Sequence, residues 1–338
     1  MTIEFARRAV IAVAVVSLLG CAPLAEKPGA SAVTVTTRDR VIVPGSRIGQ
    51  VMLTGSISEA TRLLGPQRNA SPGLWPGSVM HHWAQSGLTI VSDTETGNIL
   101  RISISEEADL SGPYARHETA EGLRLGVPEA QIVSVMGPAE RIVEDANGKS
   151  LYYDQRGIRF LVARVEPMAG RVGNLRIVWR SAPPGDAVIV PGKRISGAEV
   201  GAPIGDVLAL LGGGYQRRTG APGFPPGLKL YYWPHLALAV LENAGRVIQV
   251  LAVRQIGSDG SGIRYATAEG AGNGSDASSV REIFGGPERL ETHREPQRLL
   301  YGPNLESWAY AARGILFMLN HQRKVVLVII FQPQASGR

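Results

Sequence analysis

Four stretches of the chain place apolar residues with the period of an amphipathic helix, and each stretch ends at a glycine. In the second stretch Ile132, Val133, Val135 and Met136 fall on one face, and the glycine that follows is the expected C-cap of a helix. We therefore expect four helices, at 57–65, 129–137, 204–212 and 278–285.

A polar, proline-rich loop follows each predicted helix, and short runs of β-branched and aromatic residues come after it. Examples are 151–153, 157–162 and 172–179. The last run, 325–331, is almost entirely apolar, which indicates a strand buried on both faces. Each unit of about 70 residues thus predicts one helix and an antiparallel meander of three or four strands, so the expected fold class is α+β.

The chain also repeats itself at a displacement of about 147 residues. VIVPGSRI at 41–48 recurs as VIVPGKRI at 188–195, and RGIRF at 156–160 is answered by RGILF at 313–317. We therefore expect two duplicated halves. They are 41–180, with units at 41–108 and 113–180, and 186–332, with units at 186–256 and 263–332, followed by a tail at 333–338.

The repeated unit has a glycine-led turn, a helix ending in Leu-Leu-Gly (63–65, 210–212) or Met-Gly-Pro (136–138), and then strands. This pattern resembles the β-lactamase-inhibitor-protein fold. The same unit is found in the small outer-membrane assembly lipoproteins of the SmpA/OmlA type. The resemblance implies four tandem helix-plus-meander units and a role in binding proteins at the envelope, although those lipoproteins have one unit where this chain has four.

The first 20 residues have the three parts of an export signal in order. Arg7 and Arg8 are basic, 9–19 is apolar but shorter than the roughly 20 residues that span a bilayer, and Gly20 is small. Leu-Leu-Gly-Cys at 18–21 resembles the lipobox of bacterial lipoproteins, whose cysteine receives a diacylglycerol before the signal is cut. Cys21 is the only cysteine.

We therefore expect a signal peptide at 1–20 and a flexible linker at 21–40 that begins with lipidated Cys21. Acyl chains such as palmitate would hold the protein at the membrane. Ala22 stands where an aspartate would mark retention in the inner membrane, so the resemblance implies the outer membrane, facing the periplasm. The alternatives are a chance cysteine after an ordinary signal, or a buried helix.

The distribution of charge and the absence of common catalytic motifs reduce the number of possible functions. The net charge of +6 is carried by scattered arginines rather than by a basic run, which argues against nucleic acid as a partner. The nucleophile elbow, the P-loop and the H-E-x-x-H motif are absent from the sequence, and the glycines at 270, 272 and 274 fit a turn better than a phosphate loop. His81 and His82 are adjacent, so on a strand they point to opposite faces. We expect no catalytic residues, no metal and no cofactor.

Aromatic residues on the predicted strands are the remaining candidates. We propose an interaction face from Trp83, Tyr231, Tyr232, Trp233 and Trp308. Three consecutive aromatics cannot all point into one core, although packing inside the sheet is the simpler interpretation. The predicted function is a periplasm-facing lipoprotein module that binds a protein, as an assembly factor, scaffold or inhibitor. The alternative is an envelope enzyme with catalytic groups on its loops.

Overall fold

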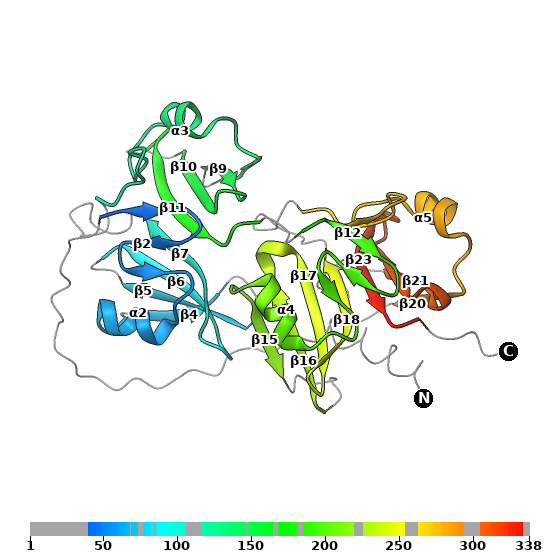
Figure 1. Cartoon of the computed structure of the whole chain (residues 1–338). Helices are drawn as coiled ribbons and strands as arrows, with labels where there is room; N and C mark the ends of the chain where they lie inside the picture. The colour runs from blue at the N-terminus through cyan, green and yellow to red at the C-terminus, as the bar shows by residue number, and fades with distance from the viewer. Residues whose placement is uncertain are drawn as a thin grey trace. The chain divides into compact units, whose positions relative to one another are not determined.

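The chain divides after Ser181 into two compact halves (Figure 1). The computed structural model describes residues 40–67, 69–73, 77–83, 86–105, 116–146, 148–164, 168–181, 185–219, 226–253, 263–293 and 305–333. The predicted signal at 1–20, Cys21 and almost all of the linker lie outside the described residues.

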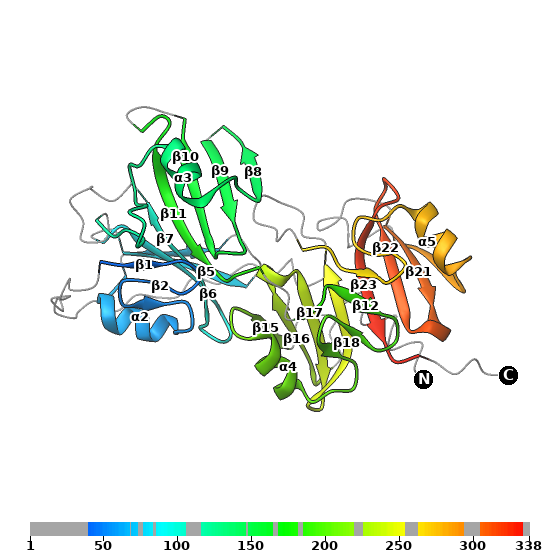
Figure 2. The same cartoon turned by 45° about the horizontal axis from the view of Figure 1, so that its top comes forward.

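The first half contains a small sheet, a large antiparallel sheet and two helices. The small sheet consists of β1 (Ile42–Val43), β2 (Arg47–Ile48) and β3 (Val51–Met52). The large sheet has the strand order β4-β5-β6-β7-β11-β10-β9-β8 (Figure 2). Its strands are β4 (Asn69–Pro72), β5 (Ser78–Trp83), β6 (Leu88–Asp93), β7 (Ile99–Ser105), β8 (Arg141–Glu144), β9 (Gly148–Tyr153), β10 (Ile158–Ala163) and β11 (Val172–Val178). The helices are α2 (Ile57–Leu64) and α3 (Glu129–Met136).

The second half has the same kind of large sheet, with the matching order β15-β16-β17-β18-β23-β22-β21-β20. Its strands are β15 (Gln216–Thr219), β16 (Leu228–Trp233), β17 (Leu238–Asn243), β18 (Arg246–Val253), β20 (Arg289–His293), β21 (Leu305–Tyr310), β22 (Ile315–Leu319) and β23 (Val325–Phe331). The small sheet consists of β12 (Val188–Val190), β13 (Arg194–Ile195), β14 (Ala198–Glu199) and β19 (Ala266–Thr267), the last parallel to β12. The helices are α4 (Ile204–Leu211), α5 (Ala277–Phe284) and the 3-10 turns η1 (Pro234–Leu236) and η2 (Ala311–Arg313).

The prediction of an α+β fold made of four helix-plus-meander units is wrong. The protein is mostly β, and the four α-helices among the described residues have eight residues each. Two facts explain the error. Neighbouring meanders hydrogen-bond through β7–β11 and β18–β23, so they merge into continuous eight-stranded sheets. The segments predicted as glycine-led turns, such as 41–48 and 188–195, also contain short strands, which form the two small sheets.

The four helices lie where the sequence predicts them, and their predicted glycine C-caps are confirmed. Gly65, Gly137, Gly212 and Gly285 follow the last helical residue with φ between 72° and 79°, a region that favours glycine. At the other end, the first helical N–H bonds to the turn between the last two strands of the same meander. The acceptors are the carbonyls of Gly97, Gly170, Gly245 and Arg323.

A repeated aromatic residue anchors each helix to its meander. The last residue of the second strand donates a hydrogen bond to the carbonyl of the glycine that ends the helix. The pairs are Trp83 Nε1 with Gly65 (2.9 Å), Tyr153 Oη with Gly137 (2.9 Å), Trp233 Nε1 with Gly212 (3.0 Å) and Tyr310 Oη with Gly285 (2.9 Å). These carbonyls have no partner inside the helix, so the bond satisfies an otherwise buried acceptor.

Both helices of a half pack on one face of its large sheet. In the first half Ala60 of α2 and Ile132 of α3 share a core with Ile102 and Phe160 of the sheet. In the second half Val207 of α4 and Val280 of α5 do the same. We call this helix-covered side the inner face of each sheet, and the opposite side the outer face.

Candidate functional site

The structure buries four of the five aromatic residues proposed as an interaction face. Trp83, Trp233 and Trp308 are at most 4% exposed and Tyr231 is 6% exposed. The indoles of Trp83 and Trp233 are the helix anchors described above, and Trp308 Nε1 donates to Glu306 Oε2 (3.0 Å). Their burial takes these four rings off the surface.

Tyr232 is the fifth candidate, and it is half-buried on the outer face of the second sheet. Tyr231 and Trp233 point to the inner face, where their rings stack with centroids 6.4 Å apart. Three consecutive aromatics fit this strand because both of its faces are packed. An exposed ring in this run would require a strand with only one buried face.

The outer face of the first sheet carries one row of polar side chains across all eight strands. Its members face one another in direct cross-strand register, so they project to the same side of the sheet. This polar row consists of Asn69, His82, Thr89, Ser103, Arg176, Arg159, Tyr152 and Arg141.

The polar row is strongly basic at one end. Arg159 and Arg176 stand directly opposite each other on β10 and β11, an arrangement that is unfavourable for like charges. Arg101, on the same face of β7, lies beside them, two residues from Ser103. Asp93 is the only acidic residue that the described strands add to this face, and it caps its own turn by accepting from Thr96 N (2.9 Å).

Local contacts hold these arginines in place. Arg159 Nε donates to Asp154 Oδ1 at 2.5 Å, and both side chains are at most 7% exposed. The guanidinium carbons of Arg141 and Arg159 lie 3.7 and 4.7 Å from the ring centroid of Tyr152, so that ring is covered by two cations. Arg176, which is half-buried, donates from Nε to Asn174 Oδ1 at 3.0 Å.

The corresponding row of the second sheet is apolar along its centre. Read from the same edge, this matching row is Gln216, Tyr232, Ala239, Leu251, Ile329, Leu316, Ala309 and Arg289. Leu251 and Ile329 belong to a buried cluster of aliphatic side chains on the outer face and are at most 1% exposed. The inner faces, by contrast, agree: Phe160 corresponds to Phe317, and both are buried.

The sequence contains this difference between the two outer faces. In the repeated motifs RGIRF and RGILF, Arg159 of the first half corresponds to Leu316 of the second. The register needed to assemble the row was missing, because its members come from eight strands far apart in the chain. His81 and His82 do point to opposite faces, as predicted. His81 is hydrogen-bonded to Ser92 Oγ on the inner side, and His82 to Thr89 Oγ1 in the polar row.

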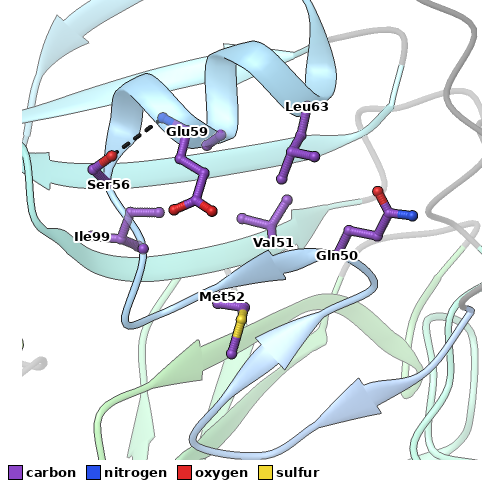
Figure 3. A pocket seen from close by; sticks show the side chains of 9 residues that line it. Gln50, Val51, Met52, Ser56, Glu59, Leu63 and Ile99 are labelled. Atoms are coloured by element: carbon purple, nitrogen blue, oxygen red, sulfur yellow. Dashed lines mark hydrogen bonds between the residues drawn. The ribbon is translucent and has the colours of Figure 1, made fainter.

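A shallow pocket lies on the inner side of the first half, between the start of α2 and β3 (Figure 3). It has an open volume of about 190 Å³, below the range of sites that enclose a small molecule. Glu59 faces it, but its neighbour Ser56 is already used as the N-cap of α2. The pocket gathers no set of catalytic groups.

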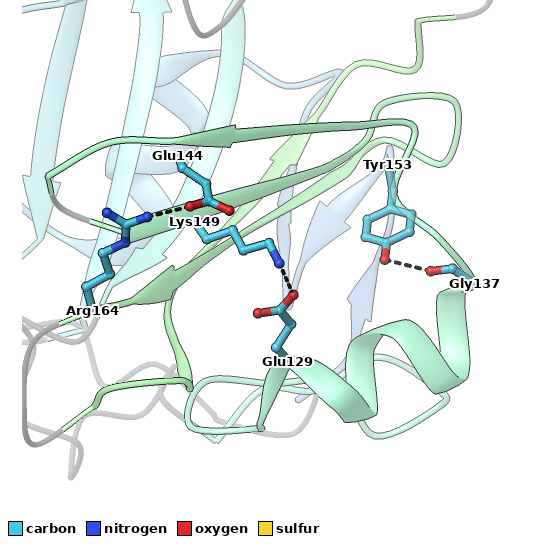
Figure 4. A network of polar contacts seen from close by, with 6 residues as sticks. All are labelled: Glu129, Gly137, Glu144, Lys149, Tyr153 and Arg164. Carbon is cyan, nitrogen blue, oxygen red and sulfur yellow. Dashed lines mark hydrogen bonds and ion pairs between the residues drawn. The ribbon is translucent and has the colours of Figure 1, made fainter.

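Ion pairs brace the second meander of the first half away from the polar row (Figure 4). Lys149 Nζ donates to Glu129 Oε1 at 2.5 Å, and this hydrogen bond raises the pKa of Lys149. Arg164 donates to Glu144 on the neighbouring strand pair. The first contact ties α3 to β9 and the second joins the end of β10 to β8, so both are structural.

Among the described residues no group of three or more His, Cys, Asp and Glu side chains is placed to hold a metal ion. In the same part of the chain, no helix has both the length and the apolar character required to cross a bilayer. Gly270 and Gly274 have positive φ, and a Cβ at Gly272 would stand 1.9 Å from the carbonyl oxygen of Tyr265. This glycine segment is the predicted tight turn.

No protein-family model matches the chain, and no curated protein matches it. Among solved structures, a DUF4309 family protein from Bacillus subtilis is 12% identical, with a TM-score of 0.27, over 40% of this chain and 88% of its own. A cysteine-rich secretory protein from Staphylococcus aureus is 16% identical, with a TM-score of 0.26, over 40% and 48%. An extracellular SCP-domain protein from Bacillus anthracis is 5% identical, with a TM-score of 0.25, over 48% and 53%. These scores are too low to support a conclusion about fold or function.

Proposed function

We propose that this protein is a lipoprotein of the bacterial envelope that binds a protein partner through the outer face of its first sheet. The observation that carries the proposal is the polar row. Two sheets with the same strand order and similar inner faces differ in chemistry on their outer faces. The second half forms this fold with Leu316 and Ile329, so the fold does not require Arg159 and Arg176.

Binding is the simplest reason to keep such a row. Opposed arginines on neighbouring strands lower stability, whereas Arg and Tyr are the residue types that dominate protein interfaces. In the polar row Arg141 and Arg176 are half-buried, and they lie on either side of the buried Tyr152 and Arg159.

The anchor is the second part of the proposal. The lipobox-like Leu18–Cys21 segment supports lipidation of Cys21, and Ala22 supports the outer membrane with the protein facing the periplasm. Cys21→Ser should leave an unprocessed precursor that takes up no labelled palmitate. Normal processing and labelling of that variant would refute the anchor.

The binding role is tested by chemical cross-linking in intact cells, followed by capture from detergent-solubilised envelopes. We expect the native chain to retain one protein in stoichiometric amount. Arg141→Ala should reduce the yield, because Arg141 lies at the open edge of the polar row, while Arg62→Ala on the exposed side of α2 should not. Equal yields from the two variants would contradict binding through this face.

A further inference from the structure

We propose that the polar row recognises an acidic segment of the partner protein, with Arg176 and Arg141, the two half-buried arginines of the row, contributing most of the charge that selects it. This inference rests on the proposed function and names the chemistry of the partner. It follows from the charge balance, the spacing and the fixed positions of the arginines.

The charge balance of the outer face is positive. The described strands of the first sheet place Arg101, Arg141, Arg159 and Arg176 on this face against one acid, Asp93. Asp154, in the turn after β9, neutralises Arg159. The described strands thus place more basic than acidic side chains on this face, and its complement is a negatively charged surface. Facing charges of opposite sign select a partner and speed its association.

The spacing fits several anionic groups rather than one. From Arg141 to Arg176 the row crosses three strand spacings, or about 14 Å. A single phosphate or carboxylate covers one of these positions. A short segment with two or three Asp or Glu residues covers them all.

The recessed position of Arg176 favours an acidic peptide over a lipid surface. Asn174 orients Arg176, and a guanidinium group fixed in this way binds carboxylates and phosphates through paired hydrogen bonds, so access decides between them. Arg101 is 4% exposed and Arg159 is 6% exposed, and both lie on inner strands of the sheet. A bilayer surface reaches protruding cations first, whereas a narrow peptide segment can reach the half-buried Arg176 on β11, between these two strands.

The test is a titration of the mature full chain in detergent with fluorescein-labelled octaglutamate, followed by anisotropy at low and moderate salt. We expect saturable binding that weakens with salt, and about tenfold weaker binding by Arg176→Ile, which copies the second half. Arg176→Lys should recover part of the loss. The matched control is Arg124→Ala, since Arg124 is an exposed arginine paired with Glu118 outside the row. Thermal unfolding of each variant confirms that it is folded.

Two results would overturn the inference. One is equal octaglutamate affinity in Arg176→Ile and Arg124→Ala. The other is binding of the native chain to phosphatidylglycerol vesicles, lost in Arg176→Ile, with none to octaglutamate, which would assign the row to lipid. If a partner is captured from envelopes equally well by Arg176→Ile and the native chain, this inference fails while the proposed binding role stands. Arg176-dependent octaglutamate binding without any captured partner would support the inference and count against that role.

Discussion

The outer faces of the two large sheets show how one fold can carry two chemistries. In the first half Arg159 and Arg176 face each other, and in the second half Leu316 and Ile329 do so at the same register. The inner faces keep the same aliphatic and aromatic packing against two helices. Because the fold is specified by the inner face and the helix anchors, the outer face is open to change. In the second half it forms a second core, and in the first it is polar.

Exchanging residues between the two faces gives the largest expected effect. Ile329→Arg places a charge among buried aliphatic side chains and should lower the free energy of unfolding by at least about 4 kcal/mol. Arg176→Ile changes a half-buried residue and should alter it by no more than about 1 kcal/mol. Denaturant unfolding of both variants measures the contrast, and similar losses would mean that the two outer faces play the same structural role.

The buried ion pair of the first half gives the next effect. Arg159→Leu leaves Asp154 buried without the cation it pairs with and should cost about 3–5 kcal/mol. Asp154→Ala should cost a similar amount for the reciprocal reason. The double variant copies Ala311 and Leu316 of the second half, so we expect it to recover most of the loss. Additive losses in the double-mutant cycle would show that the pair is not coupled.

A smaller contrast compares two equivalent positions, on β18 of the second sheet and β7 of the first. Leu251→Ala removes a fully buried side chain and should cost about 2–5 kcal/mol. Ser103→Ala, at the same place in the polar row, should change stability by less than about 1 kcal/mol, since its Oγ is buried and has no hydrogen-bond partner among the described residues. A Leu251→Ala loss below 1 kcal/mol would show that the outer face of the second sheet is not a core.

The smallest effect is on the pH dependence of stability. Burial lowers the pKa of His81 in the first half and of His293 in the second below the usual 6.5. The unfolded chain therefore binds more protons than the folded one at mildly acidic pH, and stability falls as the pH drops below about 6.5. His81→Gln should remove part of this fall, and His293→Gln another part. Unfolding curves between pH 5 and about 8 test this, and parallel curves for native and variant chains would exclude both histidines.

The sequence predicted local structure well and the sheets poorly. Apolar spacing and the closing glycines placed all four helices, because a helix depends on neighbours within a few residues. The joining of meanders through β7–β11 and β18–β23 depends on pairing between distant segments, which no local pattern records. The polar row escaped prediction for the same reason. The run Tyr231–Trp233 predicts an exposed ring only for a strand with one packed face, whereas both faces of β16 are packed.

The central claim is that the outer face of the first sheet serves binding while its chemistry is dispensable for folding. The most direct test gives that face the residues of the second half, in a variant with Arg101→Gln, Asp154→Ala, Arg159→Leu and Arg176→Ile. Octaglutamate is titrated into this variant and the native chain, with thermal unfolding of both as the folding control. We predict a cooperatively folded variant that no longer binds octaglutamate. A folded variant that binds as tightly as the native chain would contradict the account.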